Sequence, residues 1–309
     1  MAFYSPDAAM DAILADLVRD LAVEGRPGLS EQLSLTWIRY DASLLERSEP
    51  APGPLGRGAS WGGDRLRYPA SVVKLVYLMA AEVWLQRGLL EEGPELRRAL
   101  AAMIQHSSND ATALVLDLLS GTTGGPELPP EPMAVWVQQR QLVNSWLQEL
   151  AWPELRRVNA CQKTWTDGPY GRERVFYGPD LENRNRLGTD AVARLLEALM
   201  ASSLLSPPAS RRLQPLLARS LDPAQRAADP DNQVDGFLGA GLPLQARLWS
   251  KAGWMSEARH DAAYVEAEGR PPMLLVAFSE GKRCSRDSEL LPAIAQRLLA
   301  AELPGEALP

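Results

Sequence analysis

The sequence holds few of the residues that build metal centres and disulfide frameworks. Its 309 residues include two cysteines, Cys161 and Cys284, and two histidines, His106 and His260. Structural zinc sites need about four Cys or His ligands at short spacings, and disulfide scaffolds need several cysteines. Four such scattered residues predict no metal site. They also favour free thiols over a long-range disulfide in a reducing compartment.

Long apolar runs and an excess of positive charge are missing as well. No stretch approaches the roughly 20 apolar residues of a membrane-spanning helix. Asp7, Asp11 and Asp16 interrupt the N-terminal apolar pattern, and no Lys or Arg precedes them, so we expect no secretory signal. The formal net charge of −7 does not favour nucleic-acid binding. We therefore predict a cytoplasmic protein with no nucleic-acid or membrane partner; its oligomeric state is left open.

The remaining composition is that of a folded globular chain. Apolar residues make up 46% and charged residues 23% of the sequence, close to the averages for soluble domains. The order of the expected elements is helix, strand, several helices, several strands and a last helix. This order predicts an α+β fold with an antiparallel sheet flanked by helices and an all-helical lobe. We expect an α/β lobe at about 1–65 and 221–309, and a helical lobe at about 66–220.

Periodicity and turn residues place these elements along the chain. After an N-terminal amphipathic helix, helices are expected at about 71–87, 94–105, 109–121, 133–151, 189–203, 208–220 and 287–301. Strands are expected at 33–42, at the end of 243–253, and at 259–269 and 272–281. The segments 49–64 and 161–188 are expected to be loops. A loop as long as the second is usually functional or disordered.

Three short polar motifs stand at the ends of these elements. Ser71-Val72-Val73-Lys74 opens a helix, Ser107-Ser108-Asn109 joins two helices, and Lys251-Ala252-Gly253 ends a strand. Residues three apart share a helix face, so Lys74 can reach the Ser71 hydroxyl. A serine becomes a nucleophile when a base takes its proton, and burial or a second cation lowers a lysine pKa enough for that task. Free N–H groups at a helix start can help to bind an oxyanion.

This ordered set resembles the penicillin-recognising serine hydrolases, and class A β-lactamases in particular. Their pattern is Ser-x-x-Lys, then Ser-Asp-Asn, then Lys-Thr-Gly. The strings RYPASVVKL, MIQHSSNDATALVLDLL and WSKAGWMSEARHDAAYVEAEG are similar to the family's segments in their wider context, and the likeness covers roughly residues 30–300. The resemblance implies the β-lactamase fold and a serine hydrolase that opens a β-lactam amide through an acyl-enzyme, and more broadly a small-molecule amide or ester substrate. It implies no metal and no organic cofactor.

The resemblance also implies a catalytic role for five residues. Ser71 matches the acylated nucleophile, and Lys74 matches the lysine that helps to activate it. Ser107 matches the serine that relays a proton toward the leaving nitrogen. Asn109 matches the asparagine that orients the substrate amide and the motif lysine. Lys251 matches the lysine that supports this serine and attracts a substrate carboxylate.

Four further positions match substrate-binding residues of the family. Ala252 and Gly253 complete the third motif, and the N–H of Trp254 is expected to supply the second half of the oxyanion hole. Arg259 matches a carboxylate-binding arginine on the next strand, and a strand-surface cation is the competing interpretation.

The sequence departs from the class A pattern in three places. Ser108 stands where the family has aspartate, and Ala252 stands where it has threonine or serine. No Glu-x-x-Leu-Asn motif is found for the base that activates the deacylating water. Glu173 is the candidate base, with Glu182 as the other acid in that segment; the competing interpretation of Glu173 is a solvated loop acid. An amidase, esterase or peptidase with another substrate, and a non-catalytic binding protein, therefore remain alternatives.

Overall fold

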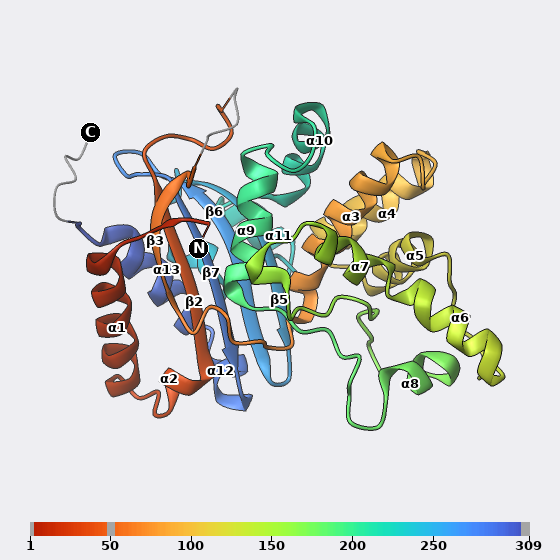
Figure 1. The fold of residues 1–309 in the computed structure, drawn as a ribbon. Coiled ribbons are helices and arrows are strands. Elements are labelled where there is room, and N and C mark those ends of the chain that lie inside the picture. Colours follow the sequence, from red (N-terminus) through yellow and green to blue (C-terminus); the bar gives the residue numbers. More distant parts are fainter. Residues whose placement is uncertain (1–2, 48–52, 304–309) are drawn as a thin grey trace. The chain divides into compact units, whose positions relative to one another are not determined.

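The computed structural model describes residues 3–47 and 53–303 and divides the chain into two compact units (Figure 1). Unit 1 combines residues 1–67 with residues 188–309, and unit 2 consists of residues 68–187. The contacts divide the chain after residue 187, whereas the predicted lobe boundary lies near residue 220. The reason is that the helix after residue 188, α9 (Thr189–Met200), packs on strands of unit 1.

Unit 1 is built on a sheet whose strand order is β1-β3-β2-β7-β6-β5-β4. The long strands are β2 (Leu33–Tyr40), β5 (Arg247–Met255), β6 (Ala258–Glu266) and β7 (Met273–Glu280), as the sequence pattern predicts. They pair antiparallel, but the two-residue β1 (Ser5–Pro6) runs parallel to β3 (Gly56–Trp61). The α+β class is confirmed, and the sheet is mixed rather than purely antiparallel. The short β4 (Ala218–Arg219) pairs with β5.

Strand β3 lies inside the segment 49–64 that was predicted to be a loop. Its glycines allow a close approach that a side chain would prevent: a Cβ atom on Gly58 would lie 2.6 Å from the Trp37 carbonyl oxygen of β2. Glycine and proline normally weaken a strand and mark turns, so the composition indicates a loop. Here the strand forms because its backbone pairs with β2 from Leu35 to Tyr40.

The two faces of the sheet bury different helices. On β2, Leu33, Leu35 and Trp37 belong to an apolar core that also contains residues of α1 (Ala8–Val23) and α13 (Leu290–Ala300). Thr36 and Tyr40 point to the other side and hydrogen-bond to α9. This alternation follows from the period of two along a strand. Unit 1 also contains α2 (Leu29–Gln32), α10 (Pro207–Leu217), α11 (Pro223–Ala228), the 3₁₀ helix η3 (Leu238–Gly241) and α12 (Lys282–Arg286).

Unit 2 is helical and is organised around α3 (Lys74–Gln86), which packs against α4, α5 and α7. Every residue of α3 from Lys74 to Trp84 is buried. The surrounding helices are α4 (Pro94–Gln105), α5 (Asn109–Ser120), α6 (Pro130–Arg140), α7 (Leu142–Glu149) and α8 (Gly171–Tyr177), with the short 3₁₀ helix η2 (Pro153–Leu155). Two expectations are wrong here: 133–151 forms two helices that meet at Gln141, and 161–188 is not wholly irregular because it contains α8.

Bilayer-crossing helices are not found in the described ranges, where every helix is too short or too polar for a membrane span.

Candidate active site

Ser71 and Lys74 stand at the head of the buried helix α3. Ser71 lies in the 3₁₀ helix η1 (Ala70–Val73), and the Lys74 backbone N–H donates to the Ser71 carbonyl. In 3₁₀ geometry, residues i and i+3 lie nearly above one another. Lys74 is buried, whereas Ser71 is partly exposed. The local fold therefore puts a buried amine and a reachable hydroxyl on one side of the same turn.

Two residues at the first two motifs, one just before the first and one opening the second, adopt strained backbone conformations. Ala70, just before the nucleophile candidate, has a φ of +46°, and Ser107 has a φ of +54°. Non-glycine residues in this left-handed region cost roughly 1–3 kcal/mol each, and such strain is concentrated at functional sites. Ala70 begins η1, and Ser107 lies between α4 and α5, so each stands where the chain turns into a helix that carries site candidates.

Among the described residues, the hydrogen bonds of the Lys74 ammonium group go to neutral oxygens of the second motif. Nζ donates to the Ser107 carbonyl, lies 3.2 Å from Ser107 Oγ and donates to Asn109 Oδ1 at 2.9 Å. Burial lowers the pKa of Lys74 from 10.5 to about 7, because desolvation penalises the charged form. Ser71, Lys74, Ser107 and Asn109 are thus placed in one unit, and Lys74 joins the first two motifs directly.

Ser108, which replaces the family's aspartate, has a local structural role. It is the N-cap of α5, and its side chain accepts a hydrogen bond from the Ala111 N–H at 3.1 Å. Serine and aspartate are both good N-caps, since each offers an oxygen to the free N–H groups of the first turn. The substitution therefore keeps the helix start that positions Asn109.

The segment after Cys161 reaches the second motif through hydroxyl groups. Thr164 is buried, and its Oγ1 donates to Asn109 Oδ1 at 2.8 Å. Thr166 Oγ1 lies 3.5 Å from Asn109 Nδ2. The residues predicted from 161–188 were acids, and neither threonine was among them. Two features of the sequence could have indicated them: this segment was already a candidate site segment, and the Asn109 amide needs hydrogen-bond partners.

Glu173 is not a solvated loop acid. It is buried in α8, where its carboxylate pairs with Arg140 and lies 3.1 Å from Lys163 Nζ. Asp117 completes the cluster, with Arg140 at 3.1 Å and Lys163 at 2.8 Å. Among the described residues, Glu173 makes no hydrogen bond to Ser71, Lys74 or Asn109. The contacts that the structure gives Glu173 indicate an anchor for the segment, and its predicted role as deacylation base is left untested.

We expect Glu173→Gln to lower the free energy of unfolding by about 3 kcal/mol, because it leaves buried cations without a compensating charge. Urea denaturation followed by circular dichroism measures the loss. Glu182→Gln is the matched control: Glu182 is exposed in the same segment, so its change should stay within about 0.5 kcal/mol. Equal stability of Glu173→Gln and wild type would contradict an anchoring role.

The third motif lies on β5 in unit 1. Lys251 is buried, and its Nζ donates to Gln233 Oε1 and, at 2.7 Å, to the Ala252 carbonyl. Ala252 donates its backbone N–H to the same Gln233 oxygen at 3.2 Å. Asp261, paired with Ala252 on β6, is fully buried, and burial raises its pKa to about 7. Lys251 belongs to unit 1 and Ser107 to unit 2, so the predicted support of Ser107 by Lys251 joins residues of different units and stays a prediction.

The backbone of β5 directs the Trp254 N–H away from the neighbouring strand β6. The Ser250 carbonyl accepts from Arg219, and the Ala252 N–H donates to Gln233, so both residues turn their backbone groups away from β6. Backbone direction alternates along a strand, so Trp254 turns its N–H to the same edge. The short strand β4 pairs with β5 only at Leu248 and Trp249 within the described residues. The Trp254 N–H therefore lies at the edge of β5 away from β6, and its part in an oxyanion hole stays a prediction.

Arg259 lies opposite Trp254 on β6 and is half-buried. Its Nε donates to the Ser285 carbonyl at 3.0 Å, and Nη1 donates to the Gly236 carbonyl at 3.1 Å. These two backbone contacts fix the guanidinium. The guanidinium also stacks near the Trp254 ring, at 5.5 Å from its centroid. Arg259 is thus a packed, oriented cation rather than a freely moving surface one; its binding of a carboxylate stays a prediction.

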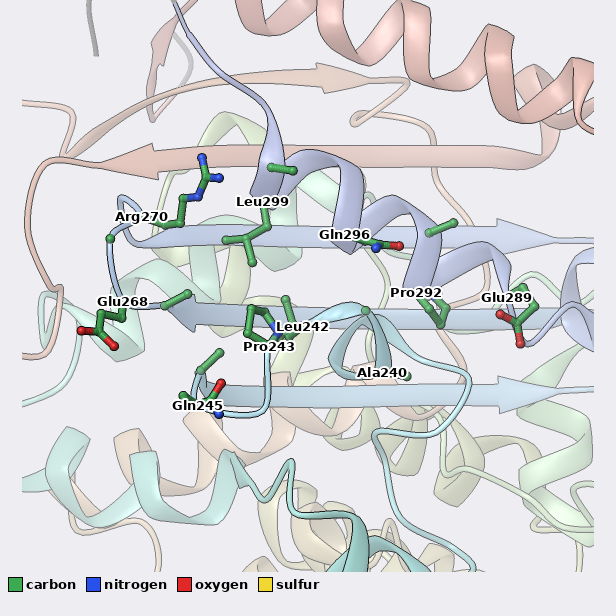
Figure 2. A pocket seen from close by; sticks show the side chains of 16 residues that line it. Ala240, Leu242, Pro243, Gln245, Glu268, Arg270, Glu289, Pro292, Gln296 and Leu299 are labelled. Atoms are coloured by element: carbon green, nitrogen blue, oxygen red, sulfur yellow. The ribbon is translucent and has the colours of Figure 1, made fainter. Parts of the chain in front are cut away.

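A cavity of about 920 Å³ in unit 1 lies between the loop after η3, the β6–β7 turn and α13 (Figure 2). Leu242, Pro243 and Leu299 give it an apolar wall, and Glu268 and Arg270 stand at its edge. None of the predicted site residues lines it. We assign it no part in the chemistry considered for Ser71.

The model of the Beta-lactamase enzyme family matches residues 85–301, a range that includes Ser107, Asn109 and Lys251 and begins after Ser71 and Lys74. No curated protein sequence matches the chain significantly.

Solved structures share the fold at low sequence identity. A β-lactamase from Xanthomonas campestris pv. campestris is 18% identical, with a TM-score of 0.63 over 95% of this chain and 98% of that one. The last common ancestor of Gram-negative bacteria β-lactamase class A is 19% identical, with a TM-score of 0.59 over 95% and 99%. The structure named PBP-A is 18% identical, with a TM-score of 0.60 over 97% and 98%. Because the family model covers more than half of the sequence, the chain belongs to the beta-lactamase enzyme family.

Proposed function

We propose that the protein is a serine hydrolase of the class A β-lactamase type, which opens a β-lactam amide through an acyl-enzyme at Ser71. The observation that carries the proposal is the burial of the Lys74 amine and its lowered pKa. This amine is buried one turn from Ser71, contacts neutral oxygens, and has a pKa lowered to about 7. An amine with this pKa is a competent general base near neutral pH.

In the proposed reaction, neutral Lys74 takes the proton of the Ser71 hydroxyl while Oγ attacks the carbonyl carbon. The amide C–N bond then breaks, and the proton passes from Lys74 through Ser107 Oγ to the leaving nitrogen. The 3.2 Å separation of Lys74 Nζ and Ser107 Oγ supports this relay. Water attacks the resulting ester, releases the acid and restores the Ser71 hydroxyl. The N–H groups of Ser71 and Trp254 are the proposed donors to the oxyanion.

The neighbourhood of Asn109 favours a second candidate function. Threonine hydroxyls, rather than a carboxylate, reach Asn109 from the segment 161–166. Without a base for the deacylating water, the acyl-enzyme would persist, as it does in a penicillin-binding protein. Fast turnover would instead support β-lactam catabolism and antibiotic resistance. An amidase, esterase or peptidase with a substrate other than an antibiotic would use the same Ser71 chemistry.

Intact-mass spectrometry after incubation with benzylpenicillin tests the proposal. We expect a mass increase equal to the whole β-lactam, on the peptide that contains Ser71. Steady hydrolysis of a chromogenic cephalosporin separates rapid deacylation from a trapped adduct. A simple ester and a fluorophosphonate serve as further probes. If none of these compounds labels Ser71 and none is hydrolysed, the protein is a non-catalytic binding relative and the proposal fails.

A further inference from the structure

The Asn109 side chain accepts two hydrogen bonds on one oxygen. Oδ1 accepts from Lys74 Nζ at 2.9 Å and from Thr164 Oγ1 at 2.8 Å. A carbonyl oxygen has two lone pairs, so both acceptor positions are occupied. Nδ2 is left with a long contact of 3.5 Å to Thr166 Oγ1. Thr164 therefore holds the amide with its oxygen, and not its nitrogen, toward Lys74.

Thr164 is itself fixed by the chain segment that carries it. The Asn185 side chain accepts from the N–H of Gln162 at 2.9 Å and donates to its carbonyl at 2.9 Å. The Tyr77 hydroxyl, from α3, donates to the same carbonyl at 2.6 Å. Lys163 is anchored by the buried ion cluster. These contacts surround the residues just before Thr164, so its hydroxyl reaches Asn109 from a fixed backbone.

The orientation of Asn109 matters most when Lys74 is neutral. A charged ammonium attracts the amide oxygen by itself. A neutral amine has a lone pair, and an amide nitrogen that turned toward it would donate a hydrogen bond into that lone pair. The lone pair would then be blocked as acceptor for the Ser71 proton. A second donor on Oδ1 opposes this rotation because turning the amide would break the hydrogen bond from Thr164.

We infer that Thr164 is a positioning residue whose hydroxyl locks the Asn109 amide and so keeps the Lys74 lone pair free for Ser71. The inference rests on the proposed function, since it assigns Lys74 as base. Thr164 touches no reacting atom; it acts through Asn109.

The charged groups around the Thr164–Asn109 hydrogen bond do not fix the orientation of the Asn109 amide. Three of them are paired within the ion cluster with Arg140: Asp117 on α5, Lys163 on the segment 161–166, and Glu173 on α8. The other ionisable groups at the second motif, His106 and Asp110, are exposed. Lys74 itself contacts only the neutral oxygens of Ser107 and Asn109 in the hydrogen bonds given above.

The experiment compares Thr164→Val, Thr164→Ser and wild type in two measurements. The first is the rate of acylation by benzylpenicillin from pH 5.5 to 9. The second is the titration of the Lys74 Cε signal in protein with ¹³C-labelled lysine, which is practicable because the chain has only four lysines: Lys74, Lys163, Lys251 and Lys282. For Thr164→Val we expect acylation at pH 8 to fall about tenfold, the size of a lost hydrogen bond. The midpoint of the Lys74 titration should fall by roughly half a pH unit, because the rotated Asn109 amide stabilises the neutral amine.

Thr122→Val is the matched control, because Thr122 is a buried threonine of the same unit that shares its hydroxyl with Ser120. We expect Thr122→Val and Thr164→Ser to keep the wild-type midpoint of the Lys74 titration. An unchanged midpoint in Thr164→Val, or an equal shift in Thr122→Val, would overturn the inference. If wild type forms no adduct, the proposed function fails, while the Lys74 titration still decides the role of Thr164.

Discussion

Replacing Ser71 with alanine is expected to abolish covalent labelling and to lower any β-lactam turnover by roughly 10⁴-fold or more, the scale seen when an enzyme loses its nucleophile. In the proposed mechanism the hydroxyl oxygen of Ser71 forms the acyl bond, and alanine offers no substitute for it. Intact-mass spectrometry with benzylpenicillin and steady-state hydrolysis of a chromogenic cephalosporin measure the two effects. The helix should form as before, since no hydrogen bond of the Ser71 hydroxyl is found among the described residues and alanine is a good helix former.

Ser145→Ala is the control for this change. Ser145 is an exposed serine of the same unit whose hydroxyl donates to the backbone carbonyl of Gln141, the N-cap of α7. It should be labelled like wild type. Labelling of Ser71→Ala at the wild-type rate would show that another residue is acylated, and the assignment of the nucleophile would then be wrong.

Replacing Lys74 with methionine is expected to reduce the acylation rate by roughly 10³-fold, within the range of general-base contributions. Methionine fills a similar volume without a charge, so the buried position should tolerate it. In wild type, the rate should rise as pH increases through about 7, because the neutral amine is the active form and burial lowers its pKa to that value. The variant should lose this dependence. Stopped-flow or quenched mass measurements from pH 5.5 to 9 give both results.

Lys282→Met removes an exposed lysine and should leave the rate and its pH dependence unchanged. Two results would contradict the assignment of Lys74 as base: a Lys74→Met variant that keeps the rise near pH 7, or a wild-type profile whose midpoint lies near the ordinary lysine pKa.

The local structure around the candidate site residues was predictable because each combines a residue type with a local constraint. Ser71 and Lys74 share one helical turn, and Asn109 follows an N-cap residue at the start of α5; both relations are short-range and follow from spacing. The strands β2, β6 and β7 were also predictable, since their apolar residues are set by burial on the sheet. Strand β3 was missed because its glycines have no local preference for a strand and pair only in the presence of β2.

The sequence by itself determined the fold class, the order of the motifs and the pairing of a serine with a lysine at one helix start, since these depend on neighbours within a few residues. The tertiary structure decided what surrounds that pair. It buried Lys74 among neutral oxygens and assigned Glu173 to Arg140 and Lys163 rather than leaving it in solvent. It also brought Thr164 to Asn109 across 55 positions of chain. Burial and long-range hydrogen bonds come from packing between distant segments, and a pKa near 7 arises only once that packing has excluded water.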